Sequence, residues 1–115
     1  MKKDNLILDK SFDFALNIIE LFKVMKSQNE FILSKQILRS GTSIGANVSE
    51  ASAAISKKDF TSKMSIASKE ARETLYWIKL LEKSKLVSFD FENIKFETES
   101  IINILTAIVK TSQNN

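Results

Sequence analysis

The sequence predicts an all-α fold, an antiparallel up-and-down four-helix bundle that forms a single domain over residues 1–115. Two observations support this prediction. The chain of 115 residues contains no proline and only two glycines, although tight turns and β-hairpins depend on these residues. Apolar residues also recur at helical spacing along four segments, which are separated by short polar breaks.

The first helix is expected over residues 9–26 and the second over residues 31–54. The core stripe of the first helix comprises Phe12, Ala15, Leu16, Ile19, Phe22 and Met25. That of the second comprises Ile37, Gly41, Ile44, Val48, Ser52 and Ile55. Gly41 and, more laterally, Gly45 would let a neighbouring helix approach closely, whereas a helix break at these glycines is the alternative.

The third helix is expected to begin after Ser56, an N-cap followed by Asp59 at the third helical position, and to continue to about residue 85. Its core stripe comprises Phe60, Met64, Ala67, Ala71, Leu75, Ile78 and Leu81. Ser88 or Asp90 is expected to cap the fourth helix. The apolar residues of that helix are Ile94, Ile101, Leu105, Ile108 and Val109.

Further faces of the second and third helices predict a contact between subunits. The second helix carries a polar stripe that comprises Arg39, Ser43, Ala46, Asn47 and Glu50. The third carries a stripe that comprises Ile66, Glu70, Glu73, Trp77 and Leu80. We expect these stripes to bury one another between subunits, with Arg39 paired to Glu70 or Glu73, because exposed apolar stripes with tryptophan are typical of interfaces. The alternatives are a solvated polar face and a Trp77 that only widens the core contact.

Positive charge is concentrated in the middle of the chain. Residues 34–87 hold ten basic and five acidic residues, whereas the whole chain carries a net charge of only +3. One face of the third helix gathers the candidate nucleic-acid-binding residues, Lys58, Lys69, Arg72, Lys79 and Lys83. Tyr76 lies beside them and is placed to stack on a base. The alternative is a solvated face whose lysines are partly neutralised along the helix, as the Lys69–Glu73 and Lys79–Glu82 spacings would allow.

The composition excludes most catalytic classes. The chain has no histidine and no cysteine, which rules out serine-hydrolase triads, thiolate nucleophiles and cysteine zinc sites. Glu70 and Glu73 are spaced for a Mg²⁺ site, but a salt bridge is the preferred interpretation because two carboxylates do not complete such a site. We therefore expect a non-enzyme that has no metal and no cofactor. No apolar run is long enough for a membrane span or a signal peptide, which predicts a cytoplasmic protein.

Three stretches carry a family resemblance: residues 39–50 (RSGTSIGANVSE), 58–60 (KDF) and 65–74 (SIASKEARET). The chain resembles the four-helix-bundle proteins encoded by intervening sequences of bacterial 23S rRNA genes. The resemblance implies a ring-forming homo-oligomer, commonly a pentamer. It also implies a distant similarity to the accessory variability protein of diversity-generating retroelements, to which binding of nucleic acid and of a reverse transcriptase is attributed.

Two positions depart from the pattern of this family. Ala51 stands where a glycine is frequent, which leaves the local turn open, and Lys69-Glu70 replaces a Gly-Ser pair, so that no role for Glu70 is inherited. We expect a non-catalytic oligomeric bundle that binds structured RNA or DNA through the basic face of the third helix. The alternative is a protein-interaction scaffold, or an adaptor for a nucleic-acid enzyme such as a reverse transcriptase.

Overall fold

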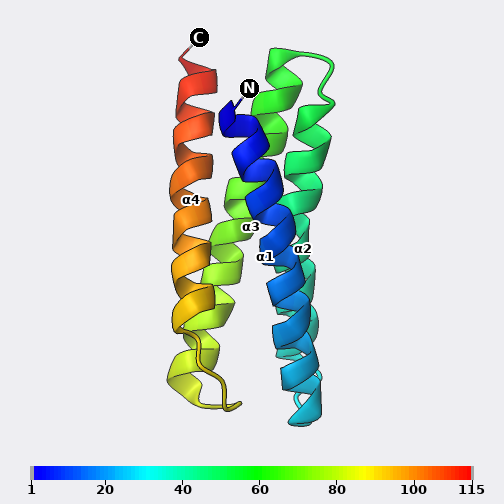
Figure 1. Ribbon diagram of the computed structural model, residues 1–115, viewed down its shortest axis with the longest axis vertical. Coiled ribbons are helices and arrows are strands. Elements are labelled where there is room, and N and C mark those ends of the chain that lie inside the picture. The colour runs from blue at the N-terminus through cyan, green and yellow to red at the C-terminus, as the bar shows by residue number, and fades with distance from the viewer. Residues whose placement is uncertain (1, 115) are drawn as a thin grey trace.

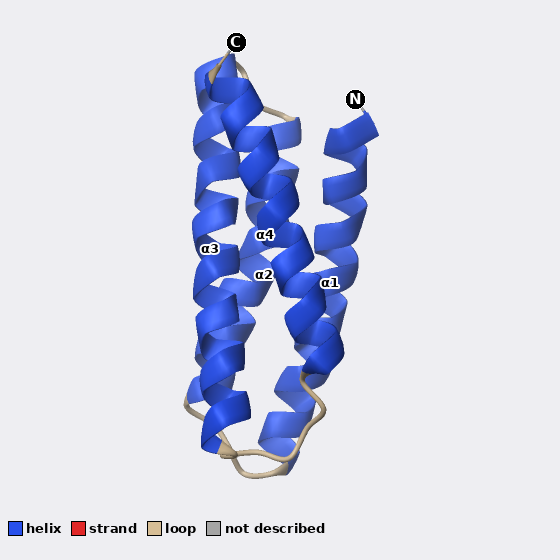
Figure 2. Cartoon of the chain, turned by 90° about the vertical axis from the view of Figure 1, so that its left-hand side faces the viewer, coloured by secondary structure: helices blue, strands red, loops and turns tan. Residues whose placement is uncertain are grey.

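The computed structural model describes residues 2–114, with side-chain surroundings from residue 6 onward. The predicted domain also includes residues 1 and 115, which lie outside this part. The four helices are α1 (Lys2–Ser27), α2 (Leu33–Ser52), α3 (Lys57–Ser84) and α4 (Glu92–Gln113). The prediction of an all-α protein with four helices is confirmed, and the described residues form no strand (Figure 2).

The helices lie side by side along a molecule 46 Å long and 20 Å across. Both chain ends lie at the end of the molecule that holds the α2–α3 loop, and the other two loops lie at the opposite end (Figure 1). Each helix packs against the next one in the chain, and α4 also contacts α1, less extensively. The four helices therefore surround one core, with α1 diagonal to α3 and α2 diagonal to α4.

Local hydrogen bonds account for the helix ends. Ser56 caps α3 as predicted, because its hydroxyl accepts a hydrogen bond from the backbone N–H of Asp59 at 3.0 Å. Lys85, with a φ angle of 56°, ends the helix in the left-handed conformation. Of the two caps predicted for α4, the Asp90 carboxylate accepts from the backbone N–H of Glu92 at 3.1 Å.

The Glu30 carboxylate marks the start of α2, which begins later than predicted. It accepts hydrogen bonds from three successive backbone N–H groups, those of Ile32, Leu33 and Ser34, at 2.7 to 3.1 Å. Burial alone would raise the pKa of this carboxyl, but the hydrogen bonds outweigh it and hold the pKa below its ordinary value. Glu30 thus serves as the cap that the sequence did not reveal.

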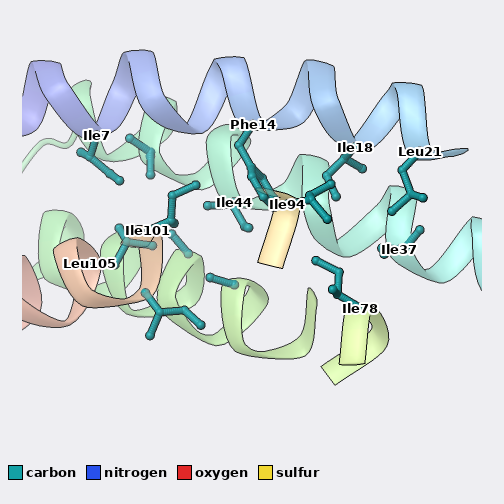
Figure 3. Packing of buried hydrophobic residues seen from close by; sticks show 14 of the residues in the cluster. Ile7, Phe14, Ile18, Leu21, Ile37, Ile44, Ile78, Ile94, Ile101 and Leu105 are labelled. Atoms are coloured by element: carbon teal, nitrogen blue, oxygen red, sulfur yellow. The ribbon is translucent and has the colours of Figure 1, made fainter. Parts of the chain in front are cut away.

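The core stripe predicted for α1 is wrong, because the helix turns a different face inward. Of the six predicted residues only Met25 is buried, while Phe12 is 65% exposed and Leu16 is 50% exposed. Figure 3 shows the side chains that α1 directs into the core instead. The buried residues of this face are Ile7, Ser11, Phe14, Ile18, Leu21 and Met25.

The two glycines of α2 explain why this face of α1 packs inward. A Cβ atom on Gly41 would lie 2.7 Å from Cγ1 of Ile18, so the Ile18 side chain occupies the space that glycine leaves open. A Cβ atom on Gly45 would lie 3.2 Å from the Ser11 carbonyl oxygen. Ser11 is itself buried, and its hydroxyl donates to the Leu8 carbonyl at 3.2 Å. The close approach predicted at both glycines is confirmed, and α2 continues through them.

The core predictions for the other helices are confirmed except at the end of α2. Ser52 and Ile55 were expected in the core, but α2 ends at Ser52, and Ile55 in the following loop is 94% exposed. The predicted stripes of α3 and α4 are buried, apart from three residues that are only partly buried against the core. These are Phe60, Leu75 and Val109.

We expect Gly41→Ala to lower the free energy of unfolding by about 1–2 kcal/mol, because the added methyl group overlaps the fully buried Ile18. A gain of about 1 kcal/mol in helix propensity offsets part of the larger packing cost. Urea unfolding followed by circular dichroism measures the change. Ser49→Ala, at an exposed position of the same helix, should change stability by at most a few tenths of a kcal/mol. A Gly41→Ala variant as stable as the wild type would contradict the packing described.

Candidate nucleic-acid interface

The Arg39 guanidinium joins α2 to α3 through two carboxylates. Its Nη1 lies 3.2 Å from Oε2 of Glu70, and its Nη2 contacts Oε2 of Glu73. The indole N–H of Trp77 donates to the same Glu73 oxygen at 3.0 Å. The predicted partners of Arg39 are therefore right. The prediction that these pairs form between subunits is wrong, because all these contacts form within one chain.

This arrangement changes the acidity of Glu73. The hydrogen bond from Trp77, with further help from the Arg39 guanidinium, holds the pKa of the Glu73 carboxyl below its ordinary value. Both carboxylates that were spaced for a metal are thus engaged by Arg39. Within residues 2–114, no group of three or more potential metal-ligating side chains occurs.

The other polar residues of the α2 stripe turn back toward their own chain. The Ser43 hydroxyl donates to the Arg39 carbonyl at 2.6 Å, and the Asn47 amide donates to the Ser43 carbonyl at 2.8 Å. Glu50 forms an ion pair with Lys63 of α3 at 3.0 Å. Each of these side chains is satisfied within one subunit, and their place in a subunit interface stays a prediction.

The apolar members of the α3 stripe are only partly covered. Trp77 is partly buried and packs against the core, as the alternative interpretation anticipated, while Ile66 and Leu80 remain exposed. Tyr76 is 59% exposed and meets the Trp77 ring edge to face, with 5.2 Å between the ring centres. An aromatic and aliphatic edge of α3 therefore faces outward.

The cations on the basic face of α3 form no ion pair with the described part of the chain. All five predicted residues are exposed, and none forms an ion pair with residues 6–114; they are Lys58, Lys69, Arg72, Lys79 and Lys83. The two acids expected to pair with them are engaged elsewhere, Glu73 by Arg39 and Glu82 by Lys95 at 3.0 Å. The ion pairs expected along the helix are therefore not formed, although the charge of Lys69 still helps to lower the pKa of Glu73.

One polar notch lies beside this face, between α3 and α4. The Arg72 side chain extends from α3 toward α4 and donates a hydrogen bond to the Thr106 hydroxyl at 3.1 Å. The notch has a volume of about 260 Å³, and no carboxylate lines it. Sequence reasoning identified Arg72 but missed Lys110, which lines the same notch from α4. No signal along the chain links these two cations, because their proximity arises only when the helices pack.

Comparison with known proteins places the chain in a family. The family model for the 23S rRNA-intervening sequence protein matches residues 3–107. The chain belongs to this family. A solved structure from Bacteroides thetaiotaomicron, described as a protein with unknown function from the S23 ribosomal protein family, is 47% identical in sequence. The match covers 94% of this chain and 98% of the Bacteroides chain, with a TM-score of 0.88. No curated protein matches.

The resemblance to proteins of the 23S rRNA intervening sequences is therefore confirmed. Within the described part of this family member, no helix has the length and apolar character needed to cross a membrane. The family description names no reaction and no ligand, so the chemistry of Arg39 with its two carboxylates, and that of the basic face, follows from the side chains alone.

The single tryptophan makes the state of Glu73 measurable. Because the pKa of Glu73 is lowered in the folded protein, its carboxylate contributes stability above the unfolded-state pKa of about 4.3, and this contribution is lost as the pH falls through the lowered pKa. We expect Trp77 fluorescence to titrate with a midpoint below that ordinary value while the far-ultraviolet dichroism remains native.

Glu73→Gln should remove this fluorescence step, whereas Glu99→Gln, at an exposed position of α4, should leave it in place. A midpoint at or above the ordinary glutamate value, or a step that survives in Glu73→Gln, would show that Glu73 is not held as described.

Proposed function

We propose that this member of the 23S rRNA-intervening sequence family is a non-catalytic, oligomeric, antiparallel bundle that binds structured nucleic acid through α3 in the cytoplasm. The observation that carries the proposal is the basic face of α3, whose cations form no ion pair among residues 6–114, while Glu73 and Glu82 are held by Arg39 and Lys95. The same commitment of Glu70 and Glu73 to Arg39 supports a non-catalytic role.

The dimensions of α3 suit a nucleic-acid backbone. From Lys58 to Lys83 the helix rises roughly 37 Å at 1.5 Å per residue, which is about one turn of a duplex. Cations placed along this length can each neutralise a phosphate and release its counterions. Tyr76 is exposed in their midst for stacking on an unpaired base, and Arg72 with Lys110 lines a notch suited to a phosphate group.

Assembly would strengthen this binding surface. Each chain carries a net charge of only +3, but its central segment has a surplus of five positive charges. Several such segments around one ring would produce a strong positive potential. A ring, commonly a pentamer, is what the family resemblance implies, and we include it in the proposal.

Binding of a labelled RNA hairpin and a DNA duplex at increasing salt tests the proposal. We expect the affinity of the wild type to fall steeply with salt, and the Lys58→Ala, Lys69→Ala, Lys79→Ala triple variant to bind more weakly. Its plot of log affinity against log salt should be shallower by about 0.7 to 0.9 for each phosphate that the variant no longer neutralises.

A matched control removes the same amount of charge from α1, which lies diagonal to α3, at Lys10, Lys23 and Lys26. The control triple variant to alanine should retain nearly the wild-type affinity and salt slope. Absence of binding by the wild type, binding that salt does not weaken, or an equal drop in affinity in the two triple variants would refute binding through α3.

A second candidate function, a protein-interaction scaffold or adaptor, is favoured by the apolar end of the bundle. The Gln28 side chain donates to the Ser88 carbonyl and accepts from its N–H, both at 2.7 Å, and so joins the two loops at this end. Four exposed apolar side chains lie in these loops: Phe31, Ile32, Leu86 and Phe89. Partner capture that survives nuclease treatment and is abolished in Ile32→Asp would support this function over the first.

A further inference from the structure

A groove follows the outside of the bundle where α3 and α4 lie side by side (Figure 1). One stretch of it is the notch of about 260 Å³ that Arg72 and Lys110 line. A second stretch, of about 740 Å³, is lined by Arg72 again, together with Phe96, Glu99 and Asn103. Because both stretches share Arg72, they form one continuous surface, which we call the α3–α4 groove.

Three side chains of the α3–α4 groove lie along one face of α4. Phe96, Asn103 and Lys110 are spaced seven residues apart, which keeps them within roughly 40° of one another around the helix. The rise from the first to the last is about 21 Å, roughly six times the 3.4 Å spacing of stacked nucleotides in one strand. The groove is therefore long enough for several nucleotides in a row, and longer than a single free nucleotide needs.

The end of the groove near Lys110 suits a phosphate group. The Arg72 hydrogen bond to Thr106 uses one of the five N–H donors of the guanidinium and holds this group at the notch, so that other donors can face a ligand. Neither Arg72 nor Lys110 forms an ion pair with residues 6–114. Hydroxyl groups, among them that of Ser65, also line the notch and can donate to phosphate oxygens. Unpaired cations beside hydroxyl donors are the groups that bind a phosphate.

The opposite end of the groove suits a base. The Phe96 ring is 72% exposed, more than any other aromatic ring in the part of the chain that the structure describes. An exposed ring beside cations is a platform on which an unpaired base stacks. Glu99 stands at this end of the groove, where its carboxylate repels phosphate and can accept a hydrogen bond from a base amino group. The groove thus has a phosphate end and a base end.

A regular duplex cannot occupy both ends at once. Its phosphates lie on the outside and can reach Arg72 and Lys110, but its bases are stacked inside the helix and cannot reach Phe96. A base that stacks on this ring has to be turned out of the helix, as in a single strand, a loop or an overhang. The two ends together therefore favour an unpaired segment.

We propose that the α3–α4 groove binds an unpaired segment of a nucleic acid, with a phosphate between Arg72 and Lys110 and a base stacked on Phe96. The inference rests on the proposed function, because it names the part of the bound nucleic acid that lies against α4. The lysines on the outer face of α3 bind the phosphates of any strand, whereas the groove selects a strand whose bases are free.

Fluorescence anisotropy with two probes tests the base end. The first probe is a labelled single strand of about ten nucleotides, and the second is the blunt duplex formed with its complement; each is made as RNA and as DNA. Phe96→Leu, which keeps an apolar side chain but removes the ring, should weaken strand binding roughly 5- to 150-fold and leave duplex binding nearly unchanged. Phe96→Trp should retain strand binding, because it keeps an aromatic ring.

Phe12→Leu is the matched control for these variants. Phe12 is 65% exposed on α1 and lies outside the α3–α4 groove. This variant should bind both probes as the wild type does. Circular dichroism confirms that each variant is folded.

A single lysine tests the phosphate end. For the single strand, Lys110→Ala should make the plot of log affinity against log salt shallower by about 0.7, because one phosphate is no longer neutralised. Lys26→Ala, in the last turn of α1, should leave this slope unchanged. Adenosine monophosphate should displace the strand only weakly, because one nucleotide cannot reach from Phe96 to Lys110.

The inference is overturned if Phe96→Leu binds the strand as tightly as the wild type, or if Phe96→Trp or Phe12→Leu loses as much affinity as Phe96→Leu does. Equal losses for strand and duplex, or a wild-type salt slope in Lys110→Ala, would also overturn it. Tight binding of adenosine monophosphate would assign the groove to a free nucleotide instead.

Salt-dependent binding of the duplex distinguishes this inference from the proposed function. If such binding persists in any of these cases, the groove is refuted as the site of an unpaired segment while binding through α3 stands. A wild type that binds neither probe would refute both.

Discussion

The packing of Ile18 over Gly41 fixes the rotation of α1, and the outer surface of the bundle follows from it. A side chain at position 41 would occupy the space that Ile18 fills, and Gly45 allows the Ser11 backbone to approach in the same way. With these two contacts made, Phe14 and Leu21 must point into the core. The more apolar opposite face of α1, which includes Phe12 and Leu16, is then left on the surface.

Pairing between α2 and α3 determines where charge remains free. Arg39 holds Glu70 and Glu73, and a fully buried hydrogen bond from Thr74 to Ser40 at 2.9 Å joins the same helices closer to the core. Carboxylates held in this way form no ion pair with the lysines on the outer face of α3. The molecule consequently has a basic α3, an uneven distribution of charge that favours polyanion binding.

The sequence predicts the four helices, the N-cap of α3, the close approach at the glycines and the partners of Arg39, because each depends on local spacing or on a single pair of helices. The sequence does not predict which face of α1 is buried. Phe12 and Leu16 form a more apolar stripe than the one that contains Ser11, and only packing against α2 decides which stripe enters the core. The sequence also cannot show whether Arg39 pairs within or between chains, since helix spacing is the same in both cases. The sequence does not reveal the position of Lys110 beside Arg72, because the notch that both residues line exists only between packed helices.

Thiol labelling of single-cysteine variants tests the orientation of α1 most directly, because the chain contains no cysteine of its own. Cysteine at position 18 should be protected at every protein concentration, whereas cysteine at position 16 should react rapidly in dilute protein. Rapid labelling at position 18, or protection at position 16 that persists on dilution, would mean that α1 buries the other face within its own subunit.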